Sequence, residues 1–129
     1  MVTSQQVQDW LDSYVEAWQT YDPELIGALF AEDAAYAYHP WDTPIRGREA
    51  IVADWLSDRD EPGSWEAEYF PLLITDAGVA ARGQSRYANG KTYENLFLLE
   101  FDDEGLCTRF EEWYMVTPDQ DGKPEANAG

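Results

Sequence analysis

The chain has 129 residues, about the length of one typical domain, and 44% of them are aliphatic or aromatic, so it can bury a hydrophobic core. Acidic residues number 26 against 8 basic ones, and the formal net charge of −18 would repel nucleic-acid phosphates and anionic membrane surfaces. With one cysteine and one histidine, an internal disulfide is impossible and a zinc site has too few soft ligands.

The first half of the chain carries helical patterns. TSQQ at 3–6 resembles a capping box, and apolar residues then recur at the spacing of one helical face up to Tyr21. Asp-Pro at 22–23 supplies an N-cap and a first helical residue, and the apolar residues up to Phe30 predict a second short helix. A short strand over 34–38 and a third helix over 48–56 follow.

From Trp65 onward the pattern changes to a period of two, which predicts strands. The four predicted strands of this antiparallel meander are near 65–75, 79–88, 92–101 and 106–116. Asn89-Gly90 is a strong signal for a two-residue hairpin turn. We therefore expect one α+β domain over 1–116, in which a curved sheet wraps around three N-terminal helices, and a flexible polar tail over 117–129.

The order of these elements, with GREAIVADW after a proline-bearing loop and FDDEGLCTRFEEWY near the end, resembles the nuclear-transport-factor-2-like superfamily, in particular its SnoaL-like branch. The resemblance covers about residues 5–116. It implies a cone-shaped, mainly antiparallel sheet of the cystatin-like kind, an apolar pocket between the helices and the concave face, and a homodimer across the outer face. The sequence supports the dimer independently, because large apolar residues alternate onto both faces of the last two strands.

Members of this superfamily perform different reactions, so the fold does not identify one. Steroid isomerases use a tyrosine on the first helix, a base before a proline at the end of the first strand, and an acid on a later strand. Tyr14 and His39 match the first two positions, and Phe97 stands at the third. Moving the alignment by one residue puts Tyr38 at the position of the base.

Limonene-type epoxide hydrolases use an Asp, Arg, Asp set with a helping tyrosine and asparagine. Gly83 and Ser85 stand where the arginine and the first aspartate would be, so the set is incomplete. Tyr36 matches the tyrosine, Tyr38 replaces the asparagine, and Glu112 matches the last aspartate. Scytalone-type dehydratases use two histidines on later strands, which this chain lacks, whereas the polyketide cyclases remain compatible.

Each candidate for catalysis has a structural alternative. His39 can exchange a proton near neutrality, or it can simply end a strand at the pocket rim. Glu112 is in phase with Phe110, and a carboxylate among aromatic rings would have the raised pKa that a general acid requires. The alternative for Glu112 is an ion pair with one of three strand arginines, Arg82, Arg86 or Arg109. Tyr14 can be a core residue of the first helix.

We therefore expect a small enzyme without cofactor or metal that binds an apolar, oxygen-bearing molecule and catalyses isomerisation, cyclisation or dehydration by proton transfer. His39 would be the base, Tyr14 the oxyanion donor and Glu112 a second acid-base group, and these three must then converge on one cavity. The residues expected to contact the substrate are Tyr36, Tyr38, Trp18, Trp55, Asn95 and Phe97. The competing hypothesis is a non-catalytic dimeric domain for ligand binding or assembly.

The sequence also bears on where the protein works. No apolar run reaches the roughly 18 residues needed to span a bilayer, and the N-terminus lacks the basic and apolar regions of a signal peptide. We therefore expect a cytoplasmic protein with neither a membrane nor a nucleic acid as partner. The acidity fits either an ordinary solvated surface or adaptation to high salt, and the sequence leaves both open.

Overall fold

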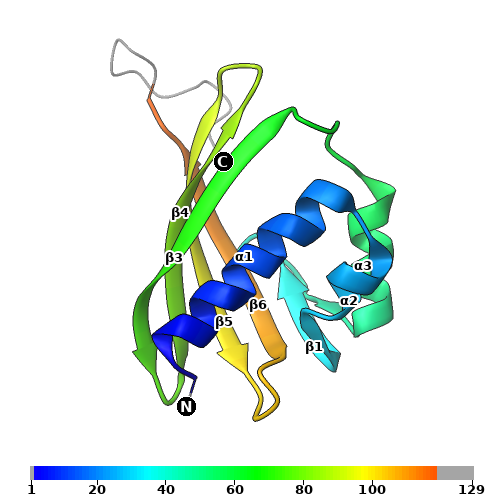
Figure 1. Ribbon diagram of the computed structural model, residues 1–129, viewed down its shortest axis with the longest axis vertical. Coiled ribbons are helices and arrows are strands. Elements are labelled where there is room, and N and C mark those ends of the chain that lie inside the picture. The colour runs from blue at the N-terminus through cyan, green and yellow to red at the C-terminus, as the bar shows by residue number, and fades with distance from the viewer. Residues whose placement is uncertain (1, 119–129) are drawn as a thin grey trace.

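A computed structural model describes residues 2–118 (Figure 1), so most of the predicted tail lies outside the described residues. These residues form three helices, α1 (Ser4–Thr20), α2 (Pro23–Gly27) and α3 (Arg48–Ser57). They also form one six-stranded sheet of β1 (Phe30–Ala37), β2 (Ile45–Arg46), β3 (Trp65–Thr75), β4 (Gly78–Tyr87), β5 (Thr92–Phe101) and β6 (Cys107–Val116).

The strands lie in the order β2-β1-β6-β5-β4-β3, and every neighbouring pair is antiparallel except β1 with β6. The sheet curves around α1, which crosses its concave face, while α2 and α3 lie beside β1 (Figure 1). The predicted fold class, an α+β cone with three helices in the concave face, is therefore confirmed.

Helix α1 begins as its sequence predicts. The Thr3 hydroxyl accepts a hydrogen bond from the Gln6 backbone N–H at 3.1 Å, and the Gln6 side chain accepts from the Thr3 N–H at 2.8 Å. This reciprocal capping satisfies two N–H groups that the first turn of a helix leaves unpaired. The apolar face of α1 then packs onto the sheet, with Val7, Trp10, Leu11, Tyr14 and Ala17 buried.

The second helix is shorter than predicted, because α2 ends at Gly27 and the chain is extended from Phe30 onward. Phe30 opposes Cys107 of β6, and the Leu29 carbonyl accepts hydrogen bonds from the Cys107 N–H and from the Trp10 indole N–H, both at 2.9 Å. These partners are distant in sequence, so the apolar spacing that suggested a helix up to Phe30 was misleading. Strand β2 was also missed, since two residues carry no alternation.

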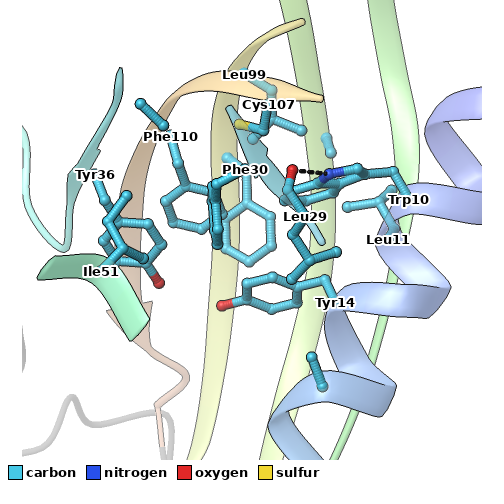
Figure 2. Close-up of a cluster of buried hydrophobic side chains, with 14 of the residues drawn as sticks. Trp10, Leu11, Tyr14, Leu29, Phe30, Tyr36, Ile51, Leu99, Cys107 and Phe110 are labelled. Carbon is cyan, nitrogen blue, oxygen red and sulfur yellow. Dashed lines mark hydrogen bonds between the residues drawn. The ribbon is translucent and has the colours of Figure 1, made fainter. Parts of the chain in front are cut away.

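The core lies between α1 and the concave face and consists largely of aromatic rings (Figure 2). Tyr36 of β1 and Phe110 of β6 stack with ring centroids 4.4 Å apart and planes 2° apart, an arrangement that their opposed register produces. Gly83 opposes Tyr69 in the β3–β4 pair, and a Cβ on Gly83 would overlap the Tyr69 ring and the Glu68 carbonyl. This glycine therefore lets the Tyr69 side chain lie across β4.

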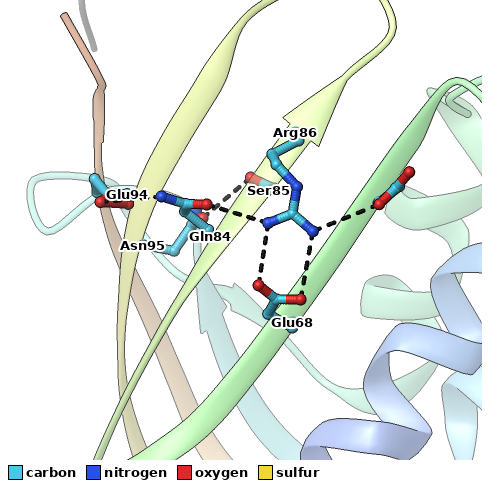
Figure 3. Close-up of polar contacts among 7 residues, drawn as sticks. Glu68, Gln84, Ser85, Arg86, Glu94 and Asn95 are labelled. Atoms are coloured by element: carbon cyan, nitrogen blue, oxygen red, sulfur yellow. Dashed lines mark hydrogen bonds and ion pairs between the residues drawn. The ribbon is translucent and has the colours of Figure 1, made fainter.

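The outer face of the sheet carries both apolar and charged side chains. Phe70, Leu98, Trp113 and Met115 are exposed there, and they lie on strands whose alternate residues are buried on the concave side. Arg86 of β4 donates to both carboxylate oxygens of Glu68 of β3, at 3.1 and 3.3 Å (Figure 3). Within residues 2–118, no helix is long and apolar enough to cross a membrane.

Candidate active site

A cavity of about 490 Å³ lies between α1, α3 and the concave face of the sheet. All eight tyrosines of the chain line it, together with Trp18 and Trp55. The remaining lining residues are polar or acidic: Asp54, Ser57, Asp58, Asp60, Ser85, Asn95 and Glu112. The lining is thus aromatic rather than aliphatic, and hydroxyl and carboxylate groups interrupt its apolar surface.

Glu112 of β6 holds the central carboxylate of this cavity. It opposes Phe97, which is fully buried on the concave side, so the alternation of the strands directs Glu112 inward as well. Its Oε2 accepts a hydrogen bond from the Asn95 side-chain amide at 2.8 Å, and the Asn95 Oδ1 accepts from the Ser85 hydroxyl at 3.0 Å. Three neighbouring strands therefore contribute one polar chain, Ser85–Asn95–Glu112, of which Figure 3 shows the Ser85–Asn95 link.

Burial raises the pKa of Glu112 to about 7, and the hydrogen bond from Asn95 opposes this shift only in part. Among residues 2–118 the ion pair that the sequence left open is not formed: Arg86 contacts Glu66 and Glu68, Arg109 contacts Glu100 and Glu111, and Arg82 is exposed on the outer face of β4. Within the described residues, Asn95 is the sole hydrogen-bond partner of the Glu112 side chain. A carboxyl group that is half ionised near neutrality can both accept and return a proton.

The tyrosine hydroxyls surround this carboxyl group. Burial, followed by the neighbouring Tyr36 and Glu112, raises the pKa of Tyr14 well above its ordinary value. Burial is also the main cause of the raised pKa of Tyr36. In Figure 2 the Tyr14 hydroxyl points away from Trp10 and toward Tyr36. Both phenols stay protonated near neutrality and are hydrogen-bond donors on the cavity wall.

His39 lies beside the cavity rather than in its lining. Its Nδ1 is 2.9 Å from the Asp42 carboxylate and its Nε2 is 3.0 Å from the Tyr114 hydroxyl, and Tyr114 does line the cavity. The His39 ring also stacks on the exposed Trp41 at 4.8 Å. If Asp42 accepts from Nδ1–H, the neutral ring accepts from the Tyr114 hydroxyl through Nε2.

The mouth of the cavity carries three aspartates on α3 and the following loop. The Tyr38 hydroxyl donates to Asp54 at 2.6 Å, and the Trp18 indole N–H donates to Asp60 at 2.9 Å. Asp58 is exposed and lies one helical turn beyond Asp54. These contacts hold two aromatic side chains of the lining in place by way of carboxylates.

Most of the residues predicted to form the site meet at this cavity. Tyr14 and Glu112 line it together, and so do the predicted substrate-contacting residues Tyr36, Tyr38, Trp18, Trp55 and Asn95. His39 does not line the cavity but contacts Tyr114, which does, whereas Tyr38 lines the cavity itself. Phe97 has no exposed surface and packs in the core beneath the cavity. The catalytic roles of these residues stay predictions.

The sequence did not predict that three aspartates, Asp54, Asp58 and Asp60, and the buried Ser85 line the cavity. Asp54 follows Ile51 at a helical spacing of three residues, so the buried face of α3 indicated that its side chain lies toward the sheet, whereas Asp58 follows the last residue of α3 and helical spacing does not place it. Ser85 and Gly83 share the inward phase of β4, and Asn95 shares that of β5. Tyr87 is in phase with Ser85 and Tyr93 is in phase with Asn95, so strand alternation indicates that both side chains lie on the concave side, where they line the cavity.

A curved sheet that closes over helices around a lined cavity defines a member of the nuclear-transport-factor-2-like superfamily. The sequence profile of the SnoaL-like domain matches residues 11–110, so the chain belongs to the SnoaL-like domain family. Metal binding gains no support from the geometry, since residues 2–118 contain no group of three or more His, Cys, Asp or Glu side chains placed to hold an ion.

Two solved structures are similar to this chain. One, from Kribbella flavida DSM 17836, is provisionally named a ketosteroid isomerase; it is 22% identical over 86% of this chain and 78% of its own, with a TM-score of 0.65. The other, an NTF2-like protein of unknown function from Mesorhizobium loti, is 18% identical over 88% of this chain and 94% of its own, with a TM-score of 0.63. At these identities the likeness concerns the fold. No curated protein matches the chain in sequence.

Proposed function

We propose that the protein is a small cytoplasmic enzyme that moves a proton on an oxygen-bearing organic molecule without a cofactor. The observation that carries this proposal is the Glu112 carboxyl group, which lines the cavity, has no basic partner among the described residues, and has a pKa of about 7. A structural carboxylate in a sheet is normally paired with a cation. One that is unpaired and titrates near neutrality is suited to general acid-base chemistry.

The proposed reaction is a proton shift next to a carbonyl group. The ionised Glu112 removes a proton from the carbon beside the carbonyl, and the electron pair of that C–H bond moves to the carbonyl oxygen to give an enolate. Tyr14, supported by Tyr36, donates a hydrogen bond to the enolate oxygen. The protonated Glu112 then returns its proton to carbon, at the same or another position, and is ionised again.

His39 is assigned in this proposal to positioning rather than to the role of base. It holds the Tyr114 hydroxyl through Nε2 while Asp42 holds its Nδ1. His39→Gln and Tyr114→Phe should therefore each lower kcat by about tenfold or less with little change in KM, and the double variant should be no slower than the slower single variant. If His39 were the base, His39→Gln would abolish turnover and Tyr114→Phe would not.

The test of the proposal follows α-proton exchange of 2-tetralone and related cyclic ketones in D₂O by ¹H NMR. The wild type should accelerate exchange, and Glu112→Gln should reduce the enzymatic rate on the order of a hundredfold. Tyr14→Phe should reduce it less, and Glu104→Gln, which removes an exposed carboxylate from the β5–β6 turn, should leave it unchanged. Exchange no faster than in buffer, or unaffected by Glu112→Gln, would favour the non-catalytic ligand-binding domain instead.

We also propose that two copies associate through the outer sheet face. In a chain of net charge −18, three of the eight basic residues, Arg82, Arg86 and Arg109, lie on outward positions of β4 and β6 among exposed apolar side chains. Arg86 is paired there with Glu66 and Glu68, and Arg109 with Glu100 and Glu111, so the arginines offset part of the negative charge of this face and reduce the repulsion between two copies. Leu98→Lys and Trp113→Lys should give a monomer by light scattering, whereas Glu104→Lys should not; a wild-type monomer at high concentration would refute the proposal.

A further inference from the structure

All charged side chains that line the cavity are acidic. Four carboxyl groups line it, Asp54, Asp58, Asp60 and Glu112, and none of its lining residues is a lysine, arginine or histidine. The contacts of Asp54 and Asp60 are with neutral donors, the Tyr38 hydroxyl and the Trp18 indole. Within residues 2–118, no ion pair involves any of the four. The lining therefore holds negative charge that no other lining side chain neutralises.

The walls between these carboxyl groups are electron-rich ring faces. Eight tyrosines and two tryptophans form them, and Trp18 stacks on Trp65 just outside the lining, with centroids 3.4 Å apart. One of these rings already holds a cation: the Arg59 guanidinium carbon lies 5.6 Å from the centroid of Tyr21. Aromatic faces combined with carboxylates are the usual protein environment for alkylated ammonium groups, which small hard metal ions do not share.

A second feature of the cavity points to an oxygen atom in the ligand. Trp55 lines the cavity, but its indole nitrogen is itself buried beside the Tyr36 side chain, so a ligand does not reach it. The donors that a ligand can meet are the phenol hydroxyl groups of the lining, among them those of Tyr14 and Tyr36. A carbonyl or hydroxyl oxygen on a bound molecule would accept hydrogen bonds from them.

We propose that the ligand of this cavity is a cation, an organic ammonium compound that also bears an oxygen function. The ammonium group would lie at the mouth among Asp54, Asp58 and Asp60, and the oxygen-bearing end would lie deeper, next to Tyr14 and Glu112. This inference rests on the proposed function only because both concern the same cavity. It changes the expected ligand from a neutral apolar molecule to an amine or a quaternary ammonium compound.

The test compares two probes of the same shape. Benzyltrimethylammonium carries the charge, and neopentylbenzene replaces its nitrogen by carbon; binding of each is followed by quenching of tryptophan fluorescence and by calorimetry. The cation should bind at least tenfold more tightly than the hydrocarbon, and phenylacetate, an anion, should not bind measurably. High salt should weaken the cation more than the hydrocarbon, since ions at the mouth screen the carboxylates.

Variants test whether a cation binds in this cavity or is attracted only by the overall negative charge of the protein. Asp58→Asn changes an exposed residue at the mouth, so it should leave folding intact while weakening the cation several-fold and the hydrocarbon not at all. Asp54→Asn should act in the same direction. Glu104→Gln removes the same charge from the distant β5–β6 turn and should change neither probe.

Three outcomes would overturn the inference: equal affinity for both probes, no binding of either, or equal weakening by Asp58→Asn and Glu104→Gln. None of them bears on the ketone exchange test, because 2-tetralone is neutral. Cation binding without proton exchange would leave the inference standing and remove the proposed enzyme. Proton exchange without a preference for the cation would support the proposed enzyme and overturn the inference of a cationic ligand.

Discussion

Replacing Glu112 with glutamine should make the protein less sensitive to rising pH. The folded protein holds the Glu112 proton up to a pKa of about 7, whereas the unfolded chain releases it near the ordinary value of 4.5. Between these two values the folded state binds more protons than the unfolded state, so the free energy of unfolding falls as the pH rises. This is the opposite sign to that of a carboxylate stabilised by an ion pair.

The size of the effect follows from the two pKa values. At about 1.36 kcal/mol per pH unit, the shift from 4.5 to about 7 corresponds to about 3 kcal/mol of lost stability once both states are ionised. Most of it, roughly 2 to 3 kcal/mol, falls between pH 5 and pH 8. With the slope usual for a small domain in urea, this is a difference of roughly 1 to 2 M in the unfolding midpoint.

The assay is urea denaturation at pH 5 and pH 8, followed by tryptophan fluorescence. Glu112→Gln should lose roughly 2 to 3 kcal/mol less than the wild type between these pH values. Glu104→Gln serves as the matched control, because it removes an exposed carboxylate and corrects for the change in net charge. If Glu112→Gln and the wild type lose the same stability, the carboxyl group does not titrate as a buried acid, and its proposed role in catalysis loses its basis.

Three further predictions concern the scaffold. Gly83→Ala should destabilise the fold by about 2 to 4 kcal/mol in urea denaturation, because the new methyl group would overlap the Tyr69 ring; Gly27→Ala, where the space is open to ordinary contact, should change stability by less than about 1 kcal/mol. Thr3→Ala should cost about 1 kcal/mol by opening the capping box, whereas Thr3→Ser should not. Cys107 is buried, and this burial raises the pKa of its thiol, so it should react with iodoacetamide only after unfolding. Rapid alkylation of the native protein, measured by mass spectrometry, would contradict its buried position.

The candidate site shows how far strand periodicity reaches. The phase of Glu112 with Phe110 indicated an inward carboxyl group, and the structure places Glu112 in the cavity lining. The same reasoning could not tell an ion pair from an isolated acid, because the partners of a strand residue depend on register. Here the register sets the arginines of β4 and β6 on the outer face and Asn95 beside Glu112.

Periodicity alone could not decide whether Tyr38 or His39 faces the cavity. A proline-based alignment put His39 at the position of a base; strand β1 ends at Ala37, and of the two residues that follow it Tyr38 lines the cavity whereas His39 does not. Tyr38 then reaches the wall and His39 contacts Tyr114 instead. Alternation reverses the direction of a side chain with each residue, so a shift of one position changes the assigned role completely.

The sequence by itself determined the helices and strands that carry strong local signals: the capped helix α1, helix α3, and the meander of β3 to β6 with its Asn-Gly turn. Periodicity and capping are local properties, so they can be read without knowing the fold. Only the tertiary structure decided the end of α2, the parallel pairing of β1 with β6 and the gathering of all eight tyrosines and four carboxyl groups around one cavity. These features depend on contacts between residues far apart in the chain and on the curvature of the sheet, and no short stretch of sequence encodes either.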